Sequence, residues 1–474
     1  MKGLRFSLAL TLGKLSAAFC KVFFPKRGSN LPGSIALRID PLFLTHISGI
    51  DKSKTIFITG TNGKSTSNNM VVHVFRTAGY SVCSNLEGAN MKPGVATALI
   101  KHSDMGGRFK NEYLILEIDE RSLEAITEDL KPGHLCVTNV QKDQVQRNGD
   151  PDYIYQKIKR AVSSVSSVPS IDGLCLYVNN EEPRSKSLGN FLNEGGRIIS
   201  FGVAKNERSS PIEKDFGVTM PCPLCHDALI FSHMNLSGVG FFSCPACGFA
   251  SNEQPDTQVT DVDYENETFR AESNQGNNTD YDRLTKDDVF RLSYSASFFL
   301  YNYSLCTCIA SEFSIEKAVL KKAFDTFTNI GGRMESFIHA GKRVTYMRVK
   351  QENPDTLQNA LDTIAGDKNE KVFIAGPDIV SDIVPFYSNT FYTYDCNFEP
   401  LINSGIEKYI CFGSIVGRDM VNRLRYAGVP EEMIEILDTD DEDKILAAIA
   451  SVKTDNIYLI TLLKKYEQLK EKAG

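Results

Sequence analysis

The sequence lacks several features, and each absence excludes a class of protein. It has no excess of positive charge, because 52 Lys and Arg side chains stand against 59 Asp and Glu side chains and give a formal net charge of −7. This balance excludes a protein that binds nucleic acid through a broadly basic surface. No internal repeat is visible, which excludes a solenoid.

The chain also lacks an uninterrupted hydrophobic run near its N-terminus. The segment from Leu4 to Phe24 is apolar but carries Arg5, Lys14 and Lys21. Its length and charges argue against a transmembrane span, and it has no small-residue cleavage site. We expect a helix packed on the following domain, with a helix lying on a membrane surface as the alternative. The two arrangements are compatible if the substrate lies at a membrane.

Disulfide bonds are not expected, although the chain has 12 cysteines. Four of them form two Cys-Pro-x-Cys pairs. The others are scattered, mostly within apolar runs: Cys20, Cys83, Cys136, Cys175, Cys306, Cys308, Cys396 and Cys411. This pattern favours a reducing cytoplasm over a disulfide framework. A length of 474 residues with 42% hydrophobic side chains predicts a soluble protein of two or three domains.

The most informative stretch directly follows the β-branched and apolar run from Thr55 to Thr59 and opens a helical pattern. A strand, a glycine-rich turn, a Lys-Ser/Thr pair and a helix form the order that a phosphate-binding loop requires. Glycines let the backbone approach the phosphates, Lys64 reaches the terminal phosphates, and Ser65 or Thr66 offers a hydroxyl to Mg²⁺. The predicted ATP-binding residues of this loop are Gly60, Thr61, Asn62, Gly63, Lys64, Ser65 and Thr66. The alternative is a glycine-rich turn that binds no ligand.

The glycine spacing indicates which kind of nucleotide enzyme this is. Only two residues separate Gly60 from Gly63, whereas the common P-loop leaves four. The tight G-T-N-G-K-S-T loop resembles the ATPase domain of the Mur ligases and folylpolyglutamate synthases. That resemblance implies an enzyme that activates a carboxylate as an acyl phosphate so that an amine can attack it.

Alternating strand-like and helical patterns between about residues 51 and 204 predict a doubly wound parallel sheet in an α/β protein. The polar stretch from Ser251 to Asp288 is either a loop-rich excursion or a set of short antiparallel strands. Beyond Gly331-Gly332, a second alternation predicts a smaller Rossmann-like α/β domain. We therefore expect an N-terminal helical segment, a central ATPase domain and a C-terminal domain, at residues 1–50, 51–330 and 331–474.

A magnesium site is predicted where acidic residues follow a buried strand, in Leu114-Ile-Leu-Glu-Ile-Asp-Glu120. In an open α/β sheet, ligands bind at the carboxyl ends of the strands. Strand alternation points Glu117 and Asp119 the same way, so that one of them completes a Mg²⁺ shell with Ser65, and we favour Glu117. The alternative is an acidic helix N-terminus, which suits Glu120.

A structural zinc site is predicted from Cys222-Pro-Leu-Cys225 and Cys244-Pro-Ala-Cys247. The two pairs have the spacing of a Cys₄ zinc ribbon, which we place at about residues 218–252. Four thiolates leave no open coordination position, so the metal would be structural. The alternative is four unrelated core cysteines, and we expect His226 to be exposed rather than a ligand.

These motifs together resemble one family over nearly the whole chain, the MurT family of Mur-ligase-like subunits of lipid II isoglutaminyl synthases. Further matching stretches are LTLGKLSAAF near the N-terminus, SNLEGANMKPGVATAL at Ser84–Leu99, TNVQKDQ at Thr138–Gln144, GGRME at Gly331–Glu335, YDCNFE at Tyr394–Glu399 and DMVNRLRYAG at Asp419–Gly428. The C-terminal domain is thus expected to be of the MurT type. As in that family, too few residues precede the P-loop strand for a UDP-sugar domain.

The resemblance implies a reaction, a partner and further site residues. The reaction is amidation of the α-carboxylate of D-isoglutamate in lipid II, with ATP, Mg²⁺ and ammonia from a GatD-type glutamine amidotransferase subunit bound to the C-terminal domain. Within this reaction Lys64 and Ser65 hold phosphate and Mg²⁺, Glu117 holds Mg²⁺, and Asn302 contacts adenine through an amide that pairs with a base edge in both directions. Arg333 either reaches the phosphates or forms an ordinary interdomain salt bridge.

The sequence departs from the family at three places. Asn389 stands where the family has the Asp that completes the Cys-His-Asp triad of the partner glutaminase, with Asp378 and Asp382 as weaker substitutes. An Asn orients a catalytic His but cannot stabilise imidazolium with a full charge. The family's K-N-P-x-G reads Glu352-Asn-Pro-Asp355 here, and Phe299 replaces a first Asn of the adenine motif.

Two alternative functions follow from these departures. One is another carboxylate–amine ligase of the Mur or folylpolyglutamate type, which would use an amine without a glutaminase partner. The other is a divergent paralogue that binds nucleotide but lacks glutaminase coupling.

Overall fold

The computed structural model describes residues 2–23, 30–86, 89–143, 150–166, 173–211, 220–274, 284–285, 287–328, 334–349, 353–376, 391–413 and 416–474. The chain divides into two compact units. The first comprises residues 1–141 and 150–330, and the second comprises residues 142–149 and 331–474.

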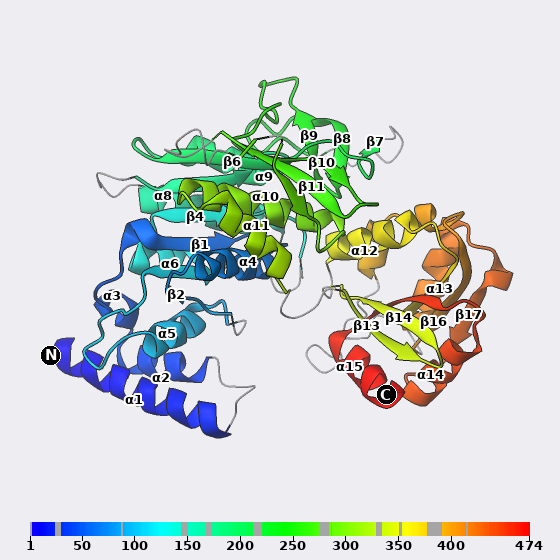
Figure 1. Cartoon of the computed structure of the whole chain (residues 1–474), viewed down its shortest axis with the longest axis horizontal. Helices are drawn as coiled ribbons and strands as arrows, with labels where there is room; N and C mark the ends of the chain where they lie inside the picture. The colour runs from blue at the N-terminus through cyan, green and yellow to red at the C-terminus, as the bar shows by residue number, and fades with distance from the viewer. Residues whose placement is uncertain are drawn as a thin grey trace. The chain divides into compact units, whose positions relative to one another are not determined.

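The first unit is built on a nine-stranded sheet in the order β12-β11-β10-β6-β5-β4-β1-β3-β2 (Figure 1). Seven neighbouring strands run parallel: β10 (Thr257–Asp263), β6 (Arg197–Val203), β5 (Cys175–Asn179), β4 (His134–Val137), β1 (Thr55–Thr59), β3 (Tyr113–Glu117) and β2 (Val82–Cys83). The central strands β1, β3 and β5 are buried along their whole length, as expected for a parallel sheet covered on both faces. The predicted α/β class with a parallel sheet is confirmed.

The polar stretch after the zinc ribbon extends this sheet at its edge. After β10 come β11 (Thr268–Ser273) and β12 (Val289–Arg291), and both pair antiparallel. For Ser251–Asp288, the expectation of short antiparallel strands is therefore closer to the structure than the expectation of a loop-rich excursion. The exception is β10, which pairs parallel with β6.

Helices cover both faces of the first sheet. One face packs against α4 (Lys64–Thr77), α10 (Ser297–Glu312) and α11 (Lys317–Thr326). The other packs against α5 (Lys92–Lys101), α6 (Leu123–Leu130) and α8 (Pro151–Ser166). The short element η1 (Lys52–Lys54) precedes β1, and α9 (Pro183–Ser187) and η2 (Leu188–Phe191) lie between β5 and β6. The helical pattern predicted after the loop is α4, whose apolar residues Met70, Val71, Val74 and Phe75 are buried against the sheet.

The face of the sheet that packs against α5, α6 and α8 is also covered by three N-terminal helices. They are α1 (Lys2–Phe23), α2 (Leu31–Ile39) and α3 (Phe43–His46). As Figure 1 shows, α1 lies along the outside of α2 and α5. The packing is close, since a Cβ on Gly33 would lie 1.8 Å from the Pro93 carbonyl oxygen. By length and composition alone, Gly3–Phe23 is long and apolar enough to cross a membrane, which corrects the expectation that this segment is too short.

The second unit has a six-stranded sheet in the order β13-β14-β18-β15-β16-β17. Its strands are β13 (Met334–His339), β14 (Lys342–Met347), β15 (Lys371–Gly376), β16 (Ile406–Phe412), β17 (Ile434–Leu437) and β18 (Asn456–Thr461), and only the β13–β14 pair is antiparallel. One face is covered by α12 (Pro354–Gly366) and α13 (Val416–Ala427), the other by α14 (Glu442–Ser451) and α15 (Leu463–Ala473). Short turns of helix are η3 (Phe391–Asp395), η4 (Glu399–Leu401) and η5 (Glu431–Met433).

The start of β4 gives the first unit a pH-dependent stability. The Nε2–H of His134 donates to the Ser53 carbonyl oxygen at 3.1 Å, and Nδ1 lies 3.0 Å from the Tyr177 hydroxyl, which suits the neutral ring. Burial lowers the pKa of His134 to about 4, despite an opposing hydrogen bond to Ser53. The folded pKa is thus below the unfolded value of about 6.5. This stabilisation is complete above pH ~6.5 and is lost as the pH falls towards 4.

We expect the His134→Gln variant to lose less stability than the original chain between pH 7 and pH 5. Its amide still donates to Ser53 but does not titrate. Urea denaturation midpoints at the two pH values measure the difference. Equal pH dependence in both proteins would contradict this role of His134.

Candidate functional site

The loop predicted to bind phosphate joins β1 to α4 and has two residues in the left-handed region. Gly60 has a φ of +121°, and a Cβ there would lie 2.4 Å from Thr138 Oγ1. Gly63 has a φ of +83°, and a Cβ there would lie 2.8 Å from Asn302 Oδ1. Any side chain at either position would be strained and would clash, which explains the two glycines.

The segment after β4 holds this loop from the side. The Thr61 N–H donates to the Asn139 carbonyl oxygen at 2.8 Å, and the Asn62 N–H donates to Asn139 Oδ1 at 2.8 Å. In return, the Asn62 carbonyl oxygen accepts from Thr138 Oγ1 at 2.7 Å and from Asn139 Nδ2 at 3.0 Å. Residues of the TNVQ stretch therefore hold the predicted phosphate loop in place through hydrogen bonds. The sequence showed it only as a family match, because its partners are some 77 residues away.

Lys64 begins α4 and is buried. Its ammonium group lies 2.9 Å from a carboxylate oxygen of Glu120 and also donates to the carbonyl oxygens of Gly60 and Thr61. Both ionic side chains are over 90% buried. Glu120 is thus paired with Lys64, and α6 begins only at Leu123, so the idea that Glu120 serves a helix N-terminus is wrong. Ser65 next to Lys64 is exposed, whereas Thr66 is buried.

The two other carboxylates of the acidic motif have different surroundings. Glu117 ends β3, is 6% exposed, and its Oε1 accepts a hydrogen bond from Asn90 Nδ2 at 2.9 Å. Asp119 forms a bidentate pair with Arg121, both contacts at 3.0 Å. Burial raises the pKa of Asp119, but hydrogen bonds and charge from Arg121 outweigh it and leave that pKa below its ordinary value. Within the described residues, the Glu117 carboxylate has a neutral side-chain partner and no ion pair, which suits a metal ligand.

Asparagines from the SNLEGANM stretch position Glu117. Asn85 Oδ1 accepts from the Glu117 N–H at 3.0 Å, and Asn85 Nδ2 donates to the Glu117 carbonyl oxygen at 2.8 Å. Asn90 then holds the carboxylate itself. Sequence reasoning used this stretch only for the family resemblance, although its two asparagines, Asn85 and Asn90, were a visible signal.

Asn302 of α10 lies against the phosphate loop. Its Oδ1 accepts from Ser67 Oγ at 3.0 Å, and its side chain is 3% exposed. Its Nδ2 is buried without a hydrogen-bond partner among the described residues. A buried amide left unpaired costs free energy, so this N–H₂ group fits a bound polar ligand such as a nucleotide. Phe299, one turn earlier, is 2% exposed and stacks on Tyr294 with ring centroids 4.7 Å apart.

Two predicted site residues, Arg333 and Asn389, lie outside the described residues, as do Asp378, Asp382 and Glu352. Nearby in the second unit, Asn353 caps α12 through its contact with the Thr356 N–H and donates to Asp143 at 2.9 Å. Lys142 pairs with Asp395 at 2.6 Å. Lys142 and Asp143, which follow TNVQ in the TNVQKDQ stretch, therefore belong to the second unit.

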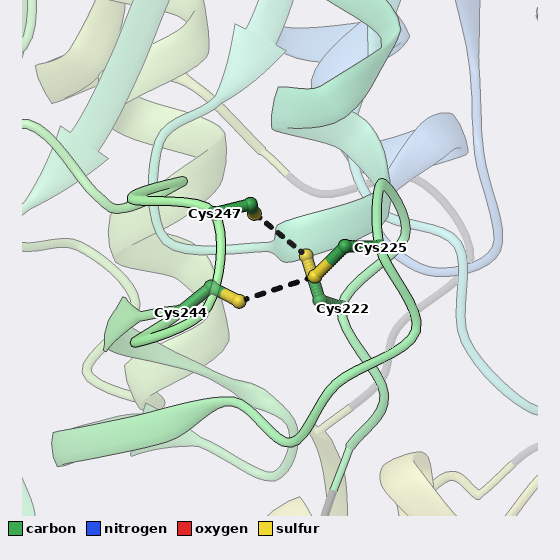
Figure 2. Close-up of side chains that lie close together, drawn as sticks. All are labelled: Cys222, Cys225, Cys244 and Cys247. Carbon is green, nitrogen blue, oxygen red and sulfur yellow. Dashed lines mark hydrogen bonds between the residues drawn. The ribbon is translucent and has the colours of Figure 1, made fainter.

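The four predicted zinc ligands converge from two loops (Figure 2). Their sulfur atoms all lie within 4.8 Å of one another, with Cys222–Cys247 at 3.7 Å and Cys225–Cys244 at 3.4 Å. A tetrahedral zinc ion with Zn–S bonds of about 2.3 Å places sulfurs about 3.8 Å apart, so the cluster fits that ion. The other eight cysteines are buried, and none of them forms a disulfide within the described part of the chain.

The two loops share one backbone geometry. His226 and Gly248, each directly after the second cysteine of its pair, have φ values of +66° and +75°. Each donates its N–H at 2.9 Å to the carbonyl oxygen of the first cysteine, Cys222 or Cys244. Such paired knuckles support the Cys₄ interpretation over four unrelated core cysteines. His226 is exposed, as expected.

The loops belong to a small sheet of β7 (Ser210–Pro211), β8 (Ile230–Leu236) and β9 (Val239–Ser243). The Asn180 side-chain amide donates from Nδ2 to the Asn252 carbonyl oxygen and accepts at Oδ1 from the Asn252 N–H, both at 2.9 Å. The Gly240 N–H donates to the Glu181 carbonyl oxygen at 2.9 Å. These contacts fix the zinc-ribbon sheet to the end of β5 in the large sheet.

Gln141 connects this zinc-ribbon sheet to the phosphate loop. Its Oε1 accepts from Asn62 Nδ2 at 3.1 Å, and its Nε2 donates to the Ser237 carbonyl oxygen at 2.7 Å. Ser237 lies in the turn between β8 and β9. One amide therefore bridges the two features that the sequence predicted separately.

We expect Gln141→Ala to weaken nucleotide binding about fivefold, because the lost hydrogen bond to Asn62 in the loop contributes about 1 kcal/mol. The zinc content should not change, since no ligand is altered. Titration with a fluorescent ATP analogue measures the affinity, and Gln258→Ala on β10 is the matched control. Unchanged affinity in the Gln141 variant would contradict the bridge.

Comparison with known proteins identifies the fold. Residues 58–239 match the Mur ligase middle domain, and residues 350–466 match the MurT ligase C-terminal domain. Among solved structures, a pseudomurein peptide ligase type C from Methanothermus fervidus is similar, with a TM-score of 0.64 at 17% identity over 90% of this chain and 80% of that chain. MurF from Acinetobacter baumannii has a TM-score of 0.62 at 12% identity over 92% and 80%.

Curated relatives narrow the identification. The chain is 25% identical over 413 residues to the lipid II isoglutaminyl synthase (glutamine-hydrolyzing) subunit MurT of Staphylococcus aureus strain COL, covering 86% of this chain and 85% of the relative. It is 25% identical over 467 residues to the subunit of the same name from Streptococcus pneumoniae strain ATCC BAA-255 / R6, covering 96% and 94%.

Fold and matches together define an ATP-dependent carbon–nitrogen ligase of the Mur type, a class whose fold implies ATP and Mg²⁺. Within this class the chain is a divergent homologue of MurT, as the sequence resemblance indicated. Its named homologues are subunits of a complex.

Proposed function

We propose that this chain is the synthetase subunit of an amidotransferase that converts the α-carboxylate of D-isoglutamate in lipid II to the carboxamide. The main support for the proposal is that one chain matches both the Mur ligase middle domain and the MurT ligase C-terminal domain. The named relatives with both parts are glutamine-hydrolysing lipid II isoglutaminyl synthase subunits.

In this reaction the loop at Gly60–Thr66, with Lys64, binds the nucleotide phosphates, and Arg333 is a further candidate for a phosphate contact. Ser65 and Glu117 hold Mg²⁺, which neutralises phosphate charge when bound. Asn302 supplies its unpaired amide N–H₂ to the nucleotide, in line with the adenine contact that the family resemblance implies. Zinc, held by the four cysteines, stays structural because no ligand position is open.

The chemistry has two balanced steps. A substrate carboxylate oxygen attacks the γ-phosphorus of ATP, and ADP leaves with the electron pair of the broken P–O bond, which gives an acyl phosphate. Ammonia then attacks the acyl carbon, and inorganic phosphate leaves as the carboxamide forms. Lys64 stabilises the charge that moves to the β,γ-bridging oxygen in the first step.

Ammonia would come from a GatD-type glutamine amidotransferase subunit bound to the C-terminal domain. Asn389 would orient the catalytic His of that partner in place of an Asp. A lipid-linked substrate places the enzyme in the cytoplasm at the inner face of the membrane.

The test is amidation of lipid II by the chain co-expressed with a glutamine amidotransferase, followed by mass spectrometry. ATP, Mg²⁺ and either glutamine or ammonium are supplied in parallel reactions. Carboxamide from both nitrogen sources is expected. Product from ammonium alone would contradict the glutaminase coupling, and product from neither would contradict the substrate and leave another Mur-type ligase or a non-catalytic paralogue.

Two variants separate the two halves of the proposal. Glu117→Gln should abolish amidation from both nitrogen sources, because it removes a magnesium ligand. Asn389→Ala should abolish only the glutamine-driven reaction. Loss of the ammonium-driven reaction in the Asn389 variant would contradict its role in the partner's triad.

A further inference from the structure

The outward face of α1 carries an unusual concentration of large apolar side chains. Seven of the twenty exposed large hydrophobic residues among the described parts of the chain belong to this one helix, with exposures from 39% to 82%. They are Leu4, Leu8, Leu12, Leu15, Phe19, Val22 and Phe23. Single exposed apolar residues are ordinary, but a continuous stripe marks an interaction surface.

The stripe is separate from the face that holds α1 on the domain. The inner face presents small side chains, Ala9, Gly13 and Cys20, with Leu10, to α2 and α5. A Cβ on Gly13 would lie 2.7 Å from Ile100 Cδ1, so the contact with α5 is close. The helix is thus apolar on two sides, one packed on protein and one open, and a helix of this kind is covered on both sides when it functions.

The charge around the stripe indicates what covers it. The first 39 residues contain seven Lys and Arg and no Asp or Glu, although the whole chain has a net charge of −7. Arg5 and Lys21 on α1 and Arg38 on α2 are exposed. We propose that the outward face of α1 docks on an anionic lipid surface, with the apolar stripe in the headgroup boundary and the basic side chains at the headgroups.

Two alternatives for the outward face of α1 fit less well: contact with a second copy of this chain, and insertion of α1 across the membrane. In a symmetric contact with a second copy, the basic surface would meet itself with no carboxylate on α1 to pair with. A membrane-spanning α1 would have to leave the domain. Lys14 Nζ donates to the carbonyl oxygens of Ile100 at 2.9 Å and Ser103 at 2.7 Å, and these contacts would be lost while three cations entered hydrocarbon.

The absence of tryptophan from the chain offers a direct probe. Phe19→Trp places the single indole on the stripe, and Tyr426→Trp, at a position 78% exposed on α13, is the matched control. Each full-length variant is titrated with vesicles of phosphatidylcholine alone or mixed with phosphatidylglycerol. We expect a blue shift only for the Trp at position 19 and only with the anionic vesicles. The shift should decrease as salt rises from about 0.05 M to about 0.5 M.

Paired variants of the position-19 protein assign the effect to the stripe and to the charges. Leu8→Ser with Leu15→Ser should lower the vesicle partition coefficient about thirtyfold or more. Arg5→Gln with Lys21→Gln should lower it about tenfold or more and flatten its salt dependence. Ile338→Ser, an equally exposed apolar residue in the second unit, should leave it unchanged. Circular dichroism and zinc content check that each variant is folded.

Several results would overturn the proposal: no blue shift, an equal shift with neutral vesicles, or a shift on dimerisation without vesicles. A shift that needs an added amidotransferase would indicate a protein partner instead. Resistance of vesicle-bound protein to alkaline extraction would indicate a spanning helix. None of these measurements uses ATP or lipid II, so their outcome is independent of the proposed ligase reaction.

Discussion

Replacing Lys64 with Met is expected to reduce ATP-dependent amidation at least about a thousandfold, because a positioned cation at the transferring phosphoryl group is lost. The same substitution leaves Glu120 as a buried carboxylate without its partner. We therefore expect a second effect, a fall of about 3–5 kcal/mol in the free energy of unfolding. Amidation rates and urea denaturation measure the two effects separately.

A double variant separates chemistry from stability. Lys64→Met combined with Glu120→Gln removes both charges, so stability should return towards the original value while amidation stays lost. Lys92→Met, which removes the partner of Asp129 at 2.7 Å, is a control ion pair in the same unit and should keep amidation. Recovery of amidation in the double variant would show that Lys64 acts only through Glu120.

Removing a ligand from the cysteine cluster is expected to have the second large effect. Cys222→Ser and Cys247→Ser should each reduce bound zinc from one ion per chain to a small fraction, because three thiolates cannot complete the tetrahedral site. Among the described residues, the apolar cluster beside the metal-binding loops is small: Leu229, Phe231 and Phe242 with Cys222 and Cys244. We expect the segment around residues 220–250 to lose its fold, as metal binding supplies folding free energy.

Elemental analysis measures the zinc, and limited proteolysis locates the unfolding. Cys20→Ser changes a buried cysteine of α1 outside the cluster and should keep one zinc ion per chain. Full metal content in both ligand variants would refute the zinc ribbon. Because Gln141 joins this sheet to the phosphate loop, nucleotide binding should weaken in parallel with zinc loss.

Features that depend on residues close together along the chain could be predicted from the sequence alone. The glycine-rich turn between β1 and α4 was predictable because strand, glycines, Lys64 and helix are contiguous. The cysteine cluster was predictable because each Cys-Pro-x-Cys pair is four residues long. The parallel sheet followed from short, fully apolar runs such as β1 and β3 between helical patterns. Membership among the MurT homologues followed from the sum of these motifs.

Contacts between residues that are far apart along the chain could be identified only in the folded structure. Glu120 pairs with Lys64 rather than with its own helix, because parallel pairing of β1 and β3 brings the ends of both strands to one edge. Asn85 and Asn90 around Glu117, Asn139 and Gln141 around the loop, and Asn302 against Gly63 all lie on other elements. Neither local propensity nor spacing encodes such contacts. They arise when the sheet closes and buried polar groups must find partners across it.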